Sequence, residues 1–161
     1  MPPPATLFPS LSPIYAFLPF SEQLATAGQP TEYHFALVRY AGFETIINLA
    51  PSDSTGALPD EDLIVEGLGL NYVPVPVRWQ DPKITDLHRF FAIMDARKDR
   101  EKLFVHCIAN MRVSAFLYLY RVLREGVPEP DARAEMHRIW KPNALWQTFL
   151  DDQLTDGETE S

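Results

Sequence analysis

Cys107 and Arg112 are the two residues of this chain whose types and spacing point to chemistry. Cys107 is the only cysteine, and it follows the apolar run Leu103–Val105 and His106. Four residues separate it from Arg112, which opens a long apolar segment of helical character. A strand, a short loop and a helix N-terminus together direct backbone N–H groups toward one point, where an oxyanion and a thiolate are both stabilised. The order predicts a cysteine nucleophile in an anion cradle, because such a field lowers the pKa of a thiol.

Each of these residues also has a purely structural interpretation. A cysteine at the end of a strand is often a small buried hydrophobic residue. Arg112 argues against that interpretation, because burying a guanidinium beside apolar residues is costly unless it meets an anion. His106 is a catalytic base, a residue that orients the cysteine loop, or a histidine satisfied within the core. Ser114 either donates a hydrogen bond to the thiolate or a leaving group, or it bonds back to the preceding helical turn.

Breaking a phosphate ester also requires a general acid that protonates the departing oxygen. Asp81, in the loop 78–82 after an apolar run, is the predicted acid, and a solvated turn aspartate before Pro82 is the alternative. Asp86 is the second candidate. Its place directly after Thr85, the predicted cap of a helix, favours an ordinary first-turn residue.

The loop between the cysteine and the arginine is predicted to bind the substrate. The residues concerned are Ile108, Ala109, Asn110, Met111 and Arg112. Where the loop needs a positive φ, Asn110 adopts it at the lowest cost. No metal site is predicted, because the other three histidines lack ligand spacing with each other or with the cysteine. No cofactor is predicted either, since the chain has no glycine between Gly69 and Gly126 that could form a nucleotide-binding loop.

Apolar spacing places these residues in an α/β fold. Strands are predicted at 43–49, 72–77 and 102–106, and Pro74 and Pro76 predict that the second of them lies at an edge or ends early. Helices are predicted from Thr31 to Gly42, from Asp60 to 67–69, from Thr85 onward, from Arg112 to Glu125, and near 130–140 and 143–153. This alternation predicts a short, central, mostly parallel sheet flanked by helices, with the ligand beyond the C-terminal ends of the strands.

Length and composition narrow the classes of function. We expect one domain, residues 1–161, with a proline-rich lead at 1–19 and a frayed acidic tail at 155–161. The net charge of −8 argues against a nucleic-acid partner, which needs clustered Lys and Arg. The chain has no apolar run of about 18 residues, so no membrane partner is expected. A single reactive thiol favours the reducing cytoplasm.

The residues Val105-His106-Cys107, the short loop, Arg112 and the helix resemble the signature of the cysteine-dependent protein tyrosine and dual-specificity phosphatase superfamily. The chain is more similar still to a small bacterial phosphatase-like family, which also forms the N-terminal domain of beta-lactamase-hydrolase-like proteins. The matching segments lie between about residues 20 and 123 and are Ala27–Thr31, Gly42-Phe43, Ile46–Leu49, Gly69, Tyr72, Pro74–Val77, Asp86-Leu87 and Phe90-Phe91. The resemblance implies a phosphatase-like fold, a phosphocysteine on Cys107, and a phosphorylated protein or small molecule as substrate.

The loop departs from the superfamily pattern in length and composition. Most members have five residues between cysteine and arginine, usually with glycines, whereas this chain has four and no glycine. Four residues are typical of rhodanese-like sulfurtransferases, which carry a persulfide on the cysteine. Phosphate-ester hydrolysis is the first hypothesis, because the surrounding matches and the Asp81 loop belong to the phosphatase-like family. Sulfur transfer is the second, and a phosphate-binding module without turnover is the third.

Overall fold

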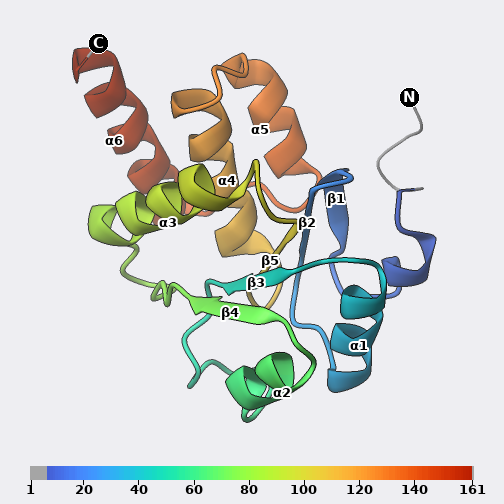
Figure 1. Ribbon diagram of the computed structural model, residues 1–161. Coiled ribbons are helices and arrows are strands. Elements are labelled where there is room, and N and C mark those ends of the chain that lie inside the picture. The colour runs from blue at the N-terminus through green and yellow to red at the C-terminus, as the bar shows by residue number, and fades with distance from the viewer. Residues whose placement is uncertain (1–6, 161) are drawn as a thin grey trace.

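The cysteine strand lies at the centre of a five-stranded sheet (Figure 1). The computed structural model describes residues 7–160. The strands are β1 (Leu18–Ser21), β2 (Leu24–Ala27), β3 (Thr45–Asn48), β4 (Asn71–Pro74) and β5 (Leu103–His106). Their order is β1-β2-β5-β3-β4; the β1–β2 pair is antiparallel and the other three pairs are parallel. Hydrogen bonds on both edges of β5 therefore fix the point from which the cysteine loop leaves the sheet.

Helices cover both faces of this sheet (Figure 1). One face carries α1 (Glu32–Tyr40) and α2 (Glu61–Gly67), beside a short 3-10 turn, η2 (Pro9–Leu11). The other face carries α3 (Ile84–Arg97), α4 (Met111–Leu123), α5 (Glu129–His137) and α6 (Ala144–Glu160). Within residues 7–160, no helix has the length and apolar character needed to cross a membrane.

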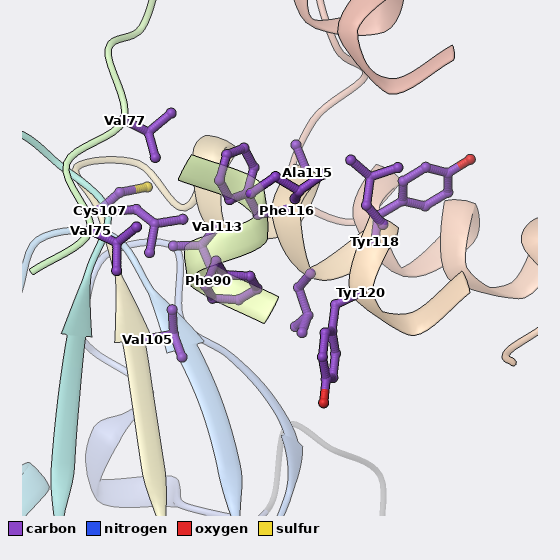
Figure 2. Packing of buried hydrophobic residues seen from close by; sticks show 14 of the residues in the cluster. Val75, Val77, Phe90, Val105, Cys107, Val113, Ala115, Phe116, Tyr118 and Tyr120 are labelled. Atoms are coloured by element: carbon purple, nitrogen blue, oxygen red, sulfur yellow. The ribbon is translucent and has the colours of Figure 1, made fainter. Parts of the chain in front are cut away.

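Alternation along β5 sends successive side chains to opposite faces of the sheet. Phe104 and His106 point toward α1, where the His106 ring lies 5.6 Å from the ring of Phe35. Val105 and Cys107 belong to the hydrophobic cluster on the α4 side, as Figure 2 shows. His106 and Cys107 thus serve different layers of the protein, although they are neighbours in the chain.

α4 is the central helix of its layer. Residues 112–120 are all buried. The ring of Phe116 contacts Phe90 of α3 at 5.9 Å and Trp146 of α6 at 6.0 Å between centroids. The predicted helix with neighbours on most sides is confirmed, because apolar residues all round it leave no polar stripe for water.

Most of the predicted architecture is confirmed. The fold is α/β, with a short, mostly parallel sheet between helices. β4 is an edge strand and ends at Pro74, in line with the low tolerance of sheets for proline. α1 begins after its predicted cap, where the Oγ1 of Thr31 accepts the backbone N–H of His34 at 3.1 Å.

The predicted cap of α3 is wrong. The helix begins at Ile84, and its N-cap is Lys83, whose side chain makes no capping hydrogen bond. Lys83 follows Pro82 and has the extended backbone of an N-cap residue, with φ −117° and ψ 147°. Thr85 consequently falls inside the first turn of the helix.

The proline-rich lead is packed into the fold wherever it is described. Phe8, Leu11 and Ile14 are buried beside α1, and the β1–β2 hairpin that follows was not predicted. Both strands are only four residues long, and Pro19 and the alanines of β2 have low β-propensity, so the pattern was too weak to detect. Residues 1–6 of the lead lie outside the described residues.

The segment predicted as a frayed tail is helical, because α6 continues to Glu160; whether it frays stays a prediction. Leu150 is buried and Leu154 is partly buried against the α4 cluster, so the helix is anchored just before the tail begins. Once a helix is nucleated, each further residue adds a hydrogen bond at little cost. Residue 161 lies outside the described residues.

We expect Phe104→Ala to lower the free energy of unfolding by about 3–5 kcal/mol. Phe104 is fully buried in β5, and its ring packs against Phe43 at 5.6 Å, so truncation leaves a cavity. Urea denaturation measures the loss. The control, Tyr40→Ala, changes a residue that is 91% exposed and should alter the free energy by less than about 0.5 kcal/mol. An equally small effect at Phe104 would contradict this account of the core.

Candidate active site

Cys107 lies directly after β5 at the C-terminal edge of the sheet and is 1% exposed. Its backbone N–H donates to the carbonyl of Ala27 at the end of β2, at 3.4 Å. Val75, Val77 and Val113 surround it in the cluster on the α4 side (Figure 2). The thiol is therefore held in a mostly apolar cluster at the point where the loop leaves the sheet.

The loop after Cys107 carries backbone N–H groups that have no acceptor. The N–H groups of residues 108–112 donate to no atom within the described part of the chain. Their neighbouring carbonyls are bonded: the Nδ1 of His106 lies 2.9 Å from the Cys107 oxygen, and the N–H of Gln29 donates to the Ile108 oxygen at 2.9 Å. In a trans peptide the C=O and N–H point in opposite directions. The N–H groups of Ile108 and Ala109 are thus turned away from His106 and Gln29.

Asn110 makes the turn between the loop and α4. It has the left-handed conformation, with φ 63° and ψ 5°, as expected of the residue that bears a positive φ at least cost. Its side-chain Nδ2 donates to the Ala16 carbonyl at 2.9 Å and to the Thr26 hydroxyl at 3.0 Å. That hydroxyl donates in turn to the Leu18 carbonyl at 2.7 Å. The unpredicted β1–β2 hairpin therefore anchors the loop.

Gly28 allows the chain after β2 to lie directly against the loop. A Cβ atom at this position would lie 2.5 Å from the Ile108 carbonyl oxygen and 2.8 Å from the ring of Tyr15. No side chain fits that space. The close approach places the N–H of Gln29, the next residue, within hydrogen-bond distance of the Ile108 carbonyl.

Arg112 is buried without an acidic partner. It is 7% exposed, its NH1 donates to the Val77 carbonyl at 3.0 Å, and its guanidinium lies 5.8 Å from the centre of the Trp79 ring. Its Nε is buried and has no hydrogen-bond partner among residues 7–160, nor does any described carboxylate pair with it. A buried cation with a spare donor is costly by itself and becomes favourable when an oxyanion binds.

His106 is linked to a carboxylate on the other face of the sheet. Its Nε2 lies 2.7 Å from the Oε2 of Glu61, the first residue of α2, and both residues are buried. Burial raises the pKa of Glu61, but the hydrogen bond and charge of His106, with the hydrogen bond from Gln29, outweigh it and leave that pKa below its usual value. Glu61 was not predicted as a site residue, because a glutamate in a first helical turn is ordinary. The one unusual feature of Glu61 is that it is buried together with an apolar residue of α2, Val65.

Asp81 lies in a turn whose neighbours, not the carboxylate itself, contact Arg112. The turn runs from Arg78 to Asp81, and those contacts come from Val77 and Trp79. The Asp81 side chain is 69% exposed and pairs with Lys83 at 3.6 Å.

Asp86 lies in the first turn of α3, where its N–H donates to the Lys83 carbonyl at 3.1 Å. The Oγ of Ser114 donates to the Met111 carbonyl at 3.0 Å, which is the bond back to the preceding turn. No cluster of three or more possible metal ligands occurs within residues 7–160.

Comparison with known proteins places the fold among phosphatases. No family model and no curated protein matched the sequence. The crystal structure of "Putative phosphatase (DUF442)" from Shewanella putrefaciens CN-32 is 37% identical, with a TM-score of 0.83, over 92% of this chain and 97% of that one. TpbA from P. aeruginosa is 15% identical, with a TM-score of 0.71, over 86% and 84%. The core catalytic domain of the PP-IP phosphatase SIW14 from S. cerevisiae is 18% identical, with a TM-score of 0.71, over 86% and 85%. The last two likenesses show the fold alone.

We expect Asn110→Ala to destabilise the protein more than Asn110→Gly. Glycine adopts the left-handed backbone without strain and loses only the two side-chain hydrogen bonds, at a cost of about 1–3 kcal/mol. Alanine loses the same bonds and is also strained, by about 1 kcal/mol more. Urea denaturation of both variants measures the difference. Equal losses would mean that the positive φ is not what requires asparagine here.

Proposed function

The chain belongs to the DUF442 family of phosphatase-like proteins, and on that premise we propose that it hydrolyses a phosphate monoester through a phosphocysteine on Cys107. The supporting observation is that the loop after a single thiol carries N–H groups, those of residues 108–112, with no acceptor in the described part of the chain, and that the buried Nε of Arg112 also has no partner there. A dianionic phosphoryl group satisfies these donors, and their field favours the thiolate over the thiol.

In the first step the Sγ of Cys107 attacks phosphorus. The S–P bond forms while the ester P–O bond breaks, and the charge on the three equatorial oxygens is held by the N–H groups of residues 108–112 and by Arg112. Asp81, in its acid form, gives its proton to the departing oxygen. Asp81 is proposed for this role because it lies in the same turn as Trp79, whose ring lies over Arg112.

In the second step water attacks the phosphocysteine. The Asp81 carboxylate takes a proton from that water, the S–P bond breaks, and inorganic phosphate and the Cys107 thiolate are released. The aspartate thus returns to its acid form and the cycle closes. An exposed carboxylate suits this role, because the same group must meet both the leaving group and water.

The substrate class we propose is a phosphorylated protein or small molecule. TpbA has been crystallised with pTyr, and SIW14 is a PP-IP phosphatase, so this fold holds both aryl phosphates and small phosphorylated molecules. The net charge of −8 repels such substrates at long range, so the local field of Arg112 and the N–H groups must supply the attraction. We propose a cytoplasmic location, where the thiol of Cys107 stays reduced.

The test is hydrolysis of an aryl phosphate by the full-length protein. Cys107→Ser should abolish turnover, and Arg112→Lys should lower kcat by at least about 100-fold, because a planar donor of two hydrogen bonds is lost. Asp81→Asn should lower kcat, because the leaving oxygen loses its proton donor, whereas Asp86→Asn, at a first-turn residue, should leave kcat unchanged. Equal rates for the wild type and Cys107→Ser would refute the mechanism.

Sulfur transfer is the second candidate, and the short loop favours it. Only four residues separate Cys107 from Arg112, and α4 already begins at Met111. The loop is therefore shorter than the five-residue loop that holds the phosphoryl group in most phosphatases of the superfamily. The thiolate would attack the outer sulfur of thiosulfate, form a persulfide and release sulfite; cyanide would then take the sulfur as thiocyanate and restore the thiolate.

Intact mass after thiosulfate treatment separates the two reactions. Sulfur transfer predicts a gain of about 32 Da, one sulfur atom, that is lost on adding cyanide and absent in Cys107→Ser. Hydrolysis without this adduct favours the phosphatase. A protein that binds inorganic phosphate and does neither reaction is a binding module, and Arg112→Ala should then weaken the binding.

A further inference from the structure

Glu61 is a buried carboxylate that the proposed reaction does not use. It is 6% exposed and lies on the face of the sheet opposite to Cys107. Its Oε1 accepts from the Nε2 of Gln29 at 2.6 Å, and its Oε2 accepts from Asn48 at 3.1 Å and faces the Nε2 of His106 at 2.7 Å. A carboxylate removed from water in this way persists only because each oxygen is hydrogen-bonded.

Two of these partners are the residues that hold the cysteine loop. His106 uses its other ring nitrogen on the Cys107 carbonyl, and Gln29 uses its backbone N–H on the Ile108 carbonyl. These carbonyls belong to consecutive peptides. Because each peptide is trans and planar, fixing its carbonyl also fixes the direction of the N–H that follows, at Ile108 and then at Ala109. One carboxylate therefore braces both supports of the loop.

The contacts of His106 use both of its ring nitrogens. One faces the Cys107 carbonyl and the other the Glu61 carboxylate, so the ring is held between the loop and α2. The other titratable groups around this site are Tyr72 of β4, which is joined to Glu61 through Asn48, and the carboxylates of Asp60, Asp62 and Glu66 on and beside α2. α1 contributes only the apolar ring of Phe35. Glu61 is thus the only described carboxylate in contact with His106.

We propose that Glu61 is a positioning residue for Cys107: through His106 and Gln29 it directs the N–H groups of Ile108 and Ala109 into the cradle, where they stabilise the thiolate. The inference rests on the proposed role of Cys107. Its consequences, oxyanion affinity and thiolate formation, are measurable without turnover.

The experiment compares the full-length wild type with Glu61→Gln. Because Cys107 is the only cysteine, the ultraviolet absorbance of the thiolate, with Cys107→Ser as the blank, reports this thiol alone. In Glu61→Gln the bracing of the loop is weakened and the N–H groups of Ile108 and Ala109 stabilise the thiolate less, so the midpoint of that titration should move up by about one pH unit. The affinity for inorganic phosphate, followed by the intrinsic fluorescence of the tryptophan cluster that includes Trp79 beside Arg112, should fall about 10-fold.

Asp62→Asn is the matched control, because it removes the same charge from the next, exposed residue of α2. It should leave the midpoint and the affinity unchanged. A wild-type profile and affinity in Glu61→Gln would overturn the inference. If that variant does not fold, Gln29→Met removes one of the two braces while leaving Glu61 in place, and it should still weaken phosphate binding by several-fold; unchanged binding would overturn the inference as well.

The outcomes also separate this inference from the proposed function. A shifted titration in a protein that hydrolyses no phosphoester removes the phosphatase proposal and leaves the role of Glu61 standing. Hydrolysis of a phosphoester, together with identical titrations in the wild type and Glu61→Gln, supports the phosphatase proposal and overturns the role of Glu61.

Discussion

Three carbonyl groups of the cysteine loop, those of Cys107, Ile108 and Asn110, are bonded away from the cradle, and the rest of the site depends on that constraint. In a planar trans peptide, a carbonyl bonded on one side directs the N–H to the other. The ring of His106, the backbone of Gln29 and the N–H of Ser114 supply those partners, for the carbonyls of Cys107, Ile108 and Asn110 in turn. The three come from β5, the segment after β2, and α4. The cradle consequently exists only when these layers are assembled.

Charge follows the same division between layers. The chain as a whole is acidic, yet it buries two basic side chains next to the cysteine loop, those of Arg112 and His106. His106 faces the Glu61 carboxylate, whereas Arg112 has no described carboxylate partner. The contact between His106 and Glu61 is complete within the protein. Arg112 keeps a donor without a partner among the described residues, and a bound oxyanion would satisfy it. Local geometry therefore opposes the long-range repulsion of the molecule.

The loop achieves its curve without a glycine of its own. Asn110 takes the left-handed turn and uses its amide to bind the β1–β2 hairpin, and Gly28, outside the loop, leaves room for the Ile108 carbonyl. A glycine at 110 would supply the backbone conformation but not the anchor. The shorter loop is thus compensated by neighbouring segments, since fewer residues leave less freedom for the loop to organise itself.

Local patterns in the sequence determined the α/β class, the buried character of β5 and α4, the cap at Thr31, and the order of Cys107, the loop and Arg112. These features depend on periodicity or on residues a few positions apart, which the sequence displays directly. The hairpin was missed because its strands are short and weakly patterned, and Thr85 was misjudged because Lys83 already had cap geometry.

Only the tertiary structure decided which distant residues support the loop. Glu61 is 45 residues from His106, and Asn110 is 94 from Ala16. Nothing in the types or spacing of those residues marks them as partners. They meet because the parallel order of β2, β5 and β3 brings the ends of segments remote in sequence to one edge of the sheet, where hydrogen bonds are chosen by packing.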